Sequence, residues 1–104
     1  MNFQVMHKYV LSFGRNIDHT HGYVSPNDWK HFTRNHITPR LSGYTELHCS
    51  GCWNDTKEDT IVVTIMYDLD VDYVIEKICN EYCTMFEQDC VMVEKSIAQV
   101  AFVG

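Results

Sequence analysis

Residues 71–96 read VDYVIEKICNEYCTMFEQDCVMVEKS, and this stretch decides the fold. In its first part, apolar residues recur every three or four positions, the spacing of one helical face. They are Val71, Val74, Ile75, Ile78, Cys79, Tyr82 and Phe86. The period then changes to two, with Val91 and Val93 alternating with Met92 and Glu94, which is typical of a strand. A helix that leads directly into a strand has to fold back over a sheet to bury its apolar face.

The composition limits the class of protein. The chain has 104 residues, of which 45% are hydrophobic and 21% charged, and we expect one globular domain over residues 1–104. A net charge of −6 disfavours nucleic acids and anionic membranes as main partners, but not a small cationic ligand. No apolar run approaches the ~20 residues that span a bilayer, and the N-terminus is too polar for a signal peptide. We therefore expect a cytoplasmic protein.

Three further runs of the chain have strand character. Each is rich in alternating, β-branched or aromatic residues. They are residues 7–13 (HKYVLSF), 44–53 (YTELHCSGCW) and 60–67 (TIVVTIMY). The run 97–103 (IAQVAFV) predicts an extra strand or an extension of the strand that begins at residue 91. The polar segments 14–23 and 54–59 predict loops, the second of them a hairpin loop.

A second helix is predicted between the first two strands. Ser25 is a favoured N-cap residue, and Pro26 suits the first helical position. Trp29 and Phe32 would share one face of this helix. Pro39 ends it, because proline lacks the N–H that the helix needs and restricts the residue before it.

The order strand, helix, strand, strand, helix, strand predicts an α+β fold. It is the split βαβ pattern of a ferredoxin-like sandwich, an antiparallel sheet with two helices on one face, here with a C-terminal strand. The other face would be uncovered, and Tyr9, Leu11, Ile65 and Phe102 are candidates for apolar residues that point outward. We therefore expect a homo-oligomer that closes this face.

Two places in the sequence carry residues that could bind a metal ion. Cys49 and Cys52, in the run CSGC after His48, have the spacing of a metal knuckle, which a second pair at Cys79 and Cys83 could complete. Against this, Cys79 belongs to the apolar helix face, and core filling explains it and also Cys90. We predict no metal site here.

The second place is the polar loop before the first helix. His19 and His21, with Asp18 beside them, could bind a metal ion. A solvated loop is the favoured interpretation, because loops are polar in any case. Composition and periodicity give no nucleophile–base pair and no phosphate-binding glycine loop.

The passage from residue 83 to residue 96 resembles the helix-to-strand passage of phage-encoded S-adenosylmethionine lyases, formerly called hydrolases. The matching residues are Glu87, Gln88, Asp89, Cys90, Val91, Val93, Lys95 and Ser96. The run Gly51-Cys52-Trp53-Asn54-Asp55 resembles a Gly-Cys-Tyr-x-Glu segment of that family, with Trp53 in place of Tyr and Asp55 in place of Glu. The order of elements also agrees, so the resemblance covers most of the chain.

A second resemblance involves an earlier part of the chain, which is similar to a family of small bacterial domains of unknown function. The residues that carry it are 24–29, Phe32, 37–40, Gly43, Thr45, Gly51 and Trp53. That family is expected to share the same fold. The match after residue 83 is sharper, and we follow it.

The resemblance to the lyases implies an enzyme that splits S-adenosylmethionine into methylthioadenosine and homoserine lactone. It implies no metal, cofactor or protein nucleophile, because the substrate's own carboxylate attacks its γ-carbon and a neutral thioether leaves. The site then has to fold the methionine tail into an attacking conformer in a dry pocket. The same resemblance implies a phage countermeasure to restriction, acting in the host bacterial cytoplasm.

The resemblance also implies a homotrimer with sites at the subunit interfaces. Glu46 and Asp55 are the candidate catalytic residues, which would hold the ammonium or sulfonium charge or a ribose hydroxyl. Tyr44 and Trp53 are the candidate substrate-binding residues, which would stack on adenine or face the sulfonium. Each also has a structural interpretation, such as a core aromatic for Trp53 and a solvated hairpin turn for Asp55.

Two other functions stay open. One is a non-catalytic small-ligand-binding module of the same fold. The other is a phage inhibitor that acts as an acidic decoy for a host nucleic-acid-binding protein. Incubation with S-adenosylmethionine separates the enzyme from both, because only the enzyme produces methylthioadenosine.

Overall fold

A computed structural model of the chain describes residues 1–17 and 22–104. Its main sheet is antiparallel and has the strand order β4-β5-β1-β6. These strands are β1 (Gln4–Gly14), β4 (Thr45–Trp53), β5 (Thr56–Tyr67) and β6 (Met92–Val100). Two very short strands, β2 (Asn16–Ile17) and β3 (Gly22–Tyr23), pair with each other.

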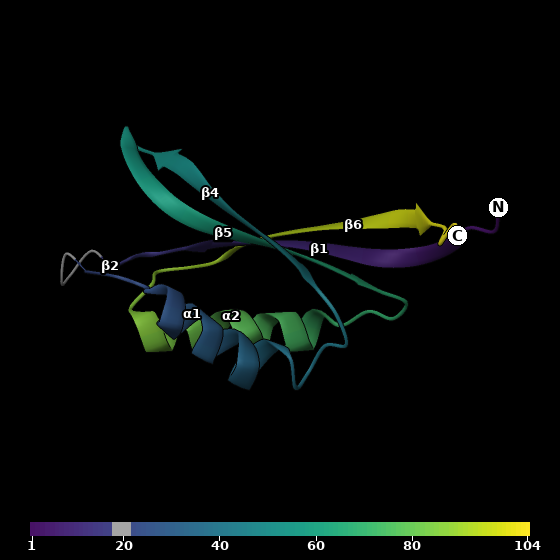
Figure 1. The fold of residues 1–104 in the computed structure, drawn as a ribbon, viewed down its shortest axis with the longest axis horizontal. Coiled ribbons are helices and arrows are strands. Elements are labelled where there is room, and N and C mark those ends of the chain that lie inside the picture. Colours follow the sequence, from purple (N-terminus) through teal and green to yellow (C-terminus); the bar gives the residue numbers. More distant parts are fainter. Residues whose placement is uncertain (18–21) are drawn as a thin grey trace.

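The helices lie together on one face of the main sheet (Figure 1). They are α1 (Pro26–Phe32), which continues into the π-helix η1 (Thr33–Ile37), and α2 (Asp72–Phe86). The predicted α+β sandwich, with an antiparallel sheet and two helices on one face, is confirmed. No helix among the described residues is both long and apolar enough to span a membrane.

The long helix α2 forms where the sequence pattern places it. Ile75, Ile78, Cys79 and Tyr82 of its apolar face are buried, as predicted. The helix ends at Glu87, which has a left-handed backbone with φ of 52°, and the Glu87 N–H caps the carbonyl of Cys83. That reversal turns the chain toward β6.

The first helix begins with a capping box. The Asp28 N–H donates to the Ser25 hydroxyl at 3.0 Å, and the Ser25 N–H donates to the Asp28 carboxylate at 3.1 Å. Ser25 and Pro26 therefore have their predicted roles.

The helical turn after α1, η1, is wider than an α-helix, because the Thr38 N–H donates to the carbonyl of Thr33 at 2.8 Å, five residues back. The sequence pattern does not predict this π-helix.

The hairpin between β4 and β5 is tighter than the sequence predicts. Its turn consists of Asn54 and Asp55, with φ of 49° and 61°, and Trp53 pairs with Thr56 across it. Two consecutive positive φ values are the mark of a two-residue type I′ turn. The predicted loop 54–59 was wrong because residues 56–59 are polar yet pair with β4 at an exposed end of the sheet.

The last strand is one continuous element. Residues 92–100 pair with residues 4–12 of β1 without interruption, so the run after Ile97 extends β6 and forms no extra strand. The strand ends at Val100, earlier than the sequence pattern indicates.

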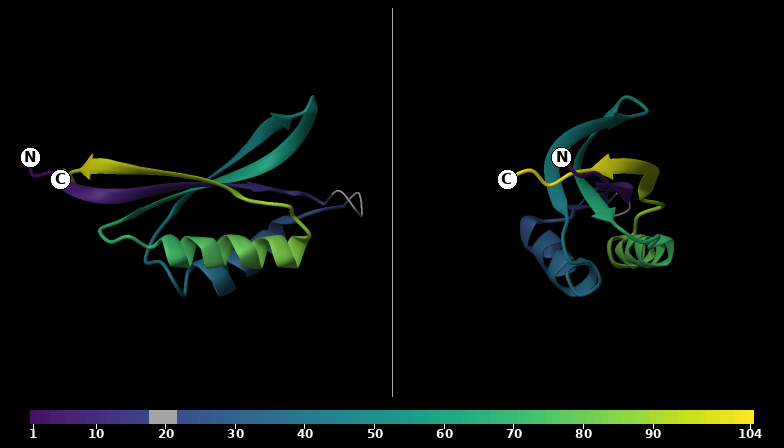
Figure 2. Two further views of the ribbon diagram at one scale, coloured as in Figure 1. Left: turned by 180° about the vertical axis from the view of Figure 1, so that it is seen from behind. Right: turned by 90° about the vertical axis from the view of Figure 1, so that its right-hand side faces the viewer.

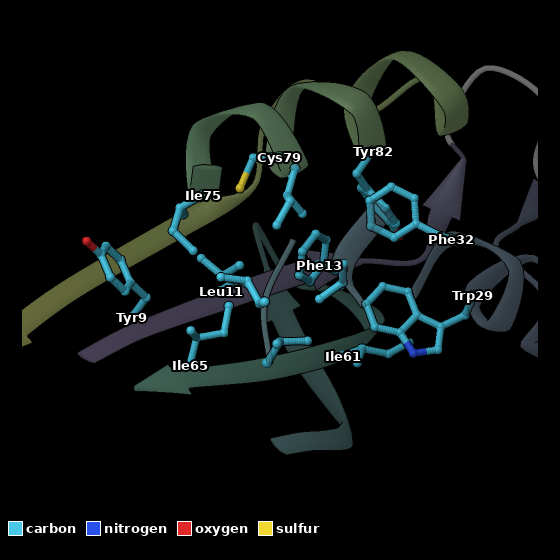
Figure 3. Close-up of a cluster of buried hydrophobic side chains, with 14 of the residues drawn as sticks. Tyr9, Leu11, Phe13, Trp29, Phe32, Ile61, Ile65, Ile75, Cys79 and Tyr82 are labelled. Carbon is cyan, nitrogen blue, oxygen red and sulfur yellow. The ribbon is translucent and has the colours of Figure 1, made fainter. Parts of the chain in front are cut away.

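The core lies between the sheet and the helices, and Figure 3 shows part of it. The Phe13 ring lies edge-on to the rings of Trp29 and Tyr82, with centroids 5.2 Å and 4.8 Å apart. Tyr9, Leu11 and Ile65 are at most 1% exposed and point into this core. For these three the expectation of an outward position was wrong, because the alternation along β1 and β5 places these odd-numbered residues under the helices, whereas Phe102 is 79% exposed.

The other face of the sheet has no covering layer among the described residues. Val10 and Val62 lie on it and are half-buried, and Leu47 is 64% exposed. The β4–β5 hairpin curls away from the helices at one end of the molecule, opposite the two termini (Figure 2). The molecule is elongated, with principal extents of 49 × 29 × 24 Å.

Candidate functional site

Glu46 is held by a buried tryptophan. It pairs with Val63 of the core, so its side chain points to the helix-covered side of the sheet. There the Trp29 Nε1–H donates to Glu46 Oε2 at 2.6 Å, while Trp29 itself is 2% exposed. The other oxygen, Oε1, lies 3.5 Å from His48 Nε2. The hydrogen bond from the indole therefore fixes the orientation of the carboxylate, which is still accessible to solvent.

Tyr44 directly precedes β4 and lies two residues before Glu46 in the sequence. It is half-buried and packs against the core. Part of the Tyr44 side chain therefore packs against the core, and the rest stays accessible to solvent. The structure brings these two predicted residues to the same end of the strand.

Trp53 and Asp55 lie at the other end of β4. Trp53 is the last residue of the strand, and Asp55 is an exposed residue of the turn. Residues 46–53 are extended, at ~3.3 Å per residue, which places Asp55 roughly 20 Å or more from Glu46. One chain therefore does not bring the two candidate acids together.

A cleft of about 460 Å³ lies between α2 and the strand β6. Ile75 and Cys79 of α2 and Val93 of β6 give it an apolar lining, and Glu76 and Asp89 add carboxylates. Figure 3 shows Ile75 and Cys79 pointing from α2 toward the strands. The sequence analysis does not single out this cleft.

A small polar network closes one end of the cleft. The Tyr9 hydroxyl donates to Asp72 Oδ1 at 2.7 Å and accepts from the Val71 N–H at 3.0 Å. The Lys95 ammonium lies 2.9 Å from Asp72 Oδ1 and 3.1 Å from Asp70 Oδ2. These hydrogen bonds, first to Asp72 and then to Asp70, raise the pKa of Lys95. The lysine is thus fixed as a cation.

A second network joins η1 and the following turn to α2. Arg40 Nη2 donates to Glu81 Oε2 at 3.0 Å, and His36 Nδ1 lies 2.7 Å from Glu81 Oε1. The hydrogen bonds from Arg40, more than those from His36, lower the pKa of Glu81 to about 2. This carboxylate links two helical elements.

A family model for proteins of unknown function, DUF3574, matches residues 8–102. The chain belongs to the DUF3574 family. This agrees with the resemblance of the N-terminal half to small domains of unknown function. No curated protein matches the chain.

The fold of this DUF3574 protein is similar to that of a phage SAM lyase in complex with S-methyl-5′-thioadenosine. The TM-score is 0.68, and the match covers 93% of this chain and 90% of that one. The two sequences are 12% identical, so the likeness shows a shared fold.

Cys49 and Cys52 of the DUF3574 protein lie on the strand β4 and do not form a metal knuckle. Cys49 and Cys52 are three residues apart on an extended strand, so their side chains point to opposite faces. No group of three or more His, Cys, Asp or Glu in residues 1–17 and 22–104 could hold a metal ion. Asp18, His19 and His21 lie outside the described residues.

The core-filling prediction holds for one cysteine and fails for another. Cys79 is 8% exposed, and burial raises the pKa of its thiol to about 12. Cys90 is exposed, because it lies in the segment that leaves α2 before β6 begins.

Sequence reasoning missed Trp29 and Lys95 as partners of site carboxylates. Trp29 was identified only as part of an apolar helix face, and Lys95 only as part of the resemblance. Their partners come from elements far away in the sequence, so the strand register has to be known before either pair can be seen. A tryptophan near the edge of a predicted core was the available signal, because a buried indole N–H needs an acceptor.

Proposed function

We propose that this protein degrades S-adenosylmethionine to methylthioadenosine and homoserine lactone. The observation that carries the proposal is the similarity of fold, along 93% of the chain, to a phage SAM lyase whose structure holds S-methyl-5′-thioadenosine. The resemblance of residues 51–55 and 83–96 to enzymes of that kind supports it. A protein charge of −6 suits a sulfonium substrate.

The reaction needs no reagent from the protein. A carboxylate oxygen of the substrate forms a bond to its own γ-carbon, the bond from that carbon to sulfur breaks, and the electron pair stays on sulfur. The products are a neutral thioether and a five-membered lactone, with no proton to remove. Because both the sulfonium and the carboxylate charge diminish toward the transition state, a dry, shaped pocket favours reaction over the solvated ground state.

Glu46 and Tyr44 supply one part of the proposed site. The Glu46 carboxylate would attract the cationic substrate, and its hydrogen bond from Trp29 would fix the direction of its oxygens. Tyr44 would offer the exposed part of its ring to the adenine or the sulfonium. Trp53 and Asp55 would complete the site from a neighbouring copy, since they lie too far from Glu46 within one chain.

This arrangement belongs to the proposed homotrimer with sites between subunits. The uncovered face of the sheet supports assembly, because it leaves Val10, Val62 and Leu47 without a covering layer. In a phage, the activity would remove the methyl donor that host restriction systems use, and it would take place in the host cytoplasm.

Incubation of the purified protein with S-adenosylmethionine tests the proposal. We expect methylthioadenosine and homoserine lactone in chromatography coupled to mass spectrometry. Glu46→Gln and Asp55→Asn should each lower kcat/KM by about 10²-fold, as the loss of one preorganised electrostatic contact commonly does.

Asp68→Asn provides the control, because Asp68 is an exposed residue of the loop after β5 and is none of the proposed site residues. It should leave turnover unchanged. Wild-type protein that leaves S-adenosylmethionine intact would refute the enzymatic function and favour a non-catalytic binding module. Normal turnover by both Glu46→Gln and Asp55→Asn would refute the assignment of these residues.

A further inference from the structure

The cleft between α2 and β6 lies apart from the candidate residues on β4. We propose that the cleft between α2 and β6 binds an organic cation with an apolar body. The nucleoside body used in the test below rests on the proposed function, whereas the cleft and its charge do not.

The size and lining of the cleft suit a small molecule. Its volume of about 460 Å³ lies within the range of ~300–1,000 Å³ that is usual for small-ligand pockets. Ile75 and Cys79 are 2% and 8% exposed on one wall, and Val93 is 44% exposed on the other. An apolar ligand body placed there would remove the exposed part of Val93 from water.

The charged residues of the cleft favour a positively charged ligand. Three carboxylates line it, those of Asp72, Glu76 and Asp89, and the one ammonium is that of Lys95. Lys95 is already bonded to Asp72. Neither Glu76 nor Asp89 takes part in an ion pair anywhere in the described ranges of the chain. A cation in the cleft would therefore be attracted by two carboxylates that lack a counter-charge.

The thiol on the cleft wall does not add to this charge. Burial raises the pKa of Cys79 to about 12, so the group is a neutral, polarizable thiol at physiological pH. A soft organic cation is a better neighbour for such a wall than a strongly hydrated metal ion, which prefers oxygen ligands.

The cleft also contains residues of the passage 83–96, none of which belongs to the proposed site on β4. The passage 83–96 carries the sharper of the two resemblances found in the sequence, and Asp89, Val91, Val93 and Lys95 of this passage line the cleft. These residues lie in the segment after α2 and in β6, and they also form one wall of the open cleft.

A matched pair of nucleosides tests the charge preference. The cation is 5′-(dimethylsulfonio)-5′-deoxyadenosine, which has no carboxylate and so cannot undergo the proposed reaction. The neutral partner is methylthioadenosine, which lacks one methyl group and the charge. Calorimetric titration should show that the cation binds about tenfold more tightly, as expected for contacts with two exposed carboxylates.

Two double variants locate the source of that preference. Glu76→Gln with Asp89→Asn should reduce the tenfold difference to about twofold or less, since it removes both unpaired carboxylates. Asp68→Asn with Glu94→Gln makes the same charge change outside the cleft and should keep the difference. On wild-type protein, the cation should shift the backbone amide NMR signals of residues 75–83 and 89–95.

Equal affinity for the two nucleosides, no binding of either, or amide shifts confined to other residues would overturn the proposal. So would a tenfold preference that survives Glu76→Gln with Asp89→Asn. Turnover of S-adenosylmethionine is a separate outcome. If the sulfonium probe binds the cleft and S-adenosylmethionine stays intact, the proposed function fails while the cation site stands.

Discussion

Glu46 shows how a single residue combines a structural contact with a proposed functional one. The Glu46 carboxylate lies on the helix-covered side of the sheet and still reaches solvent, and the buried Trp29 N–H holds one of its oxygens. The indole also needs this acceptor, because a buried N–H without a partner costs about 1–3 kcal/mol. The two residues therefore hold each other in place.

Trp29→Phe tests whether Trp29 positions Glu46 for function. The variant keeps an aromatic ring in the core and removes the N–H donor. We expect kcat/KM for S-adenosylmethionine to fall by about fivefold to tenfold, with KM more affected than kcat, because the substrate charge loses an oriented partner. Stability should fall by about 1–3 kcal/mol, measured by urea unfolding.

Tyr82→Phe is the matched control for Trp29→Phe. It removes another buried hydrogen bond, from the Tyr82 hydroxyl to the Gly14 carbonyl at 2.6 Å, but one that does not reach Glu46. It should cost a similar amount of stability and leave the kinetic constants unchanged. If both variants change turnover alike, Trp29 acts only through stability.

At the scale of elements, a charged cluster joins α2 to η1 and the turn after it. Glu81 accepts hydrogen bonds from Arg40 and contacts His36, and its pKa of about 2 lies below the ordinary value of 4.5. A lowered pKa in the folded state means that the contribution to stability is fully present above pH 4.5. It is lost as the pH falls from 4.5 toward 2.

We predict that Glu81→Gln lowers the free energy of unfolding at pH 7 by about 1–2 kcal/mol, since the pair lies near the surface. The difference from wild type should shrink as the pH falls below 4.5. Urea unfolding at pH 7, 4 and 3 measures it. A difference that is the same at all three pH values would show that the ionised pair contributes nothing.

The turn of the β4–β5 hairpin separates the structural and functional interpretations of Asp55. Its φ of 61° is strained for most residues and free for glycine, so Asp55→Gly should keep or raise the thermal stability. If Asp55 also contacts the substrate, the same variant should lower kcat/KM by about 10²-fold. Full activity with unchanged stability would leave Asp55 as a turn residue alone.

The elements also show what a sequence pattern can predict here. Local signals were sufficient for α2, with its apolar face, and for the start of α1, with its capping box. The two-residue hairpin turn and the full length of β5 were not predicted, because Thr56–Asp59 have polar side chains and pair with β4 through their backbone. The side of the sheet on which Tyr9 and Leu11 lie was not predicted either, since alternation alone does not say which face of a sheet the helices cover.

The candidate site was predictable only in part for a related reason. Glu46 and Asp55 were both proposed with the resemblance to the lyases, from their places on and just after the second predicted strand, and their roles stay predictions. The pairs Trp29–Glu46 and Lys95–Asp72 depend on contacts across 17 and 23 positions of sequence. Such contacts follow from sheet register and helix placement, which are properties of the whole chain.

At the scale of the whole molecule, the uncovered sheet face and the long separation between the two ends of β4 both point to assembly. We predict a trimer in solution, measured as three times 12.2 kDa by light scattering after size exclusion. Val62→Lys, at the centre of the uncovered face, should shift the population toward smaller species because it places a charge in the interface. A wild-type protein that is monomeric at all concentrations would contradict this.

The central claim is that the substrate's own carboxylate displaces its sulfur, and one labelling measurement tests it most directly. S-Adenosylmethionine is incubated with the protein in H₂¹⁸O, and the products are analysed by mass spectrometry. The account predicts methylthioadenosine together with homoserine lactone free of ¹⁸O, and any homoserine formed later should carry ¹⁸O in its carboxylate. Homoserine with ¹⁸O in its hydroxyl group, or no methylthioadenosine at all, would contradict it.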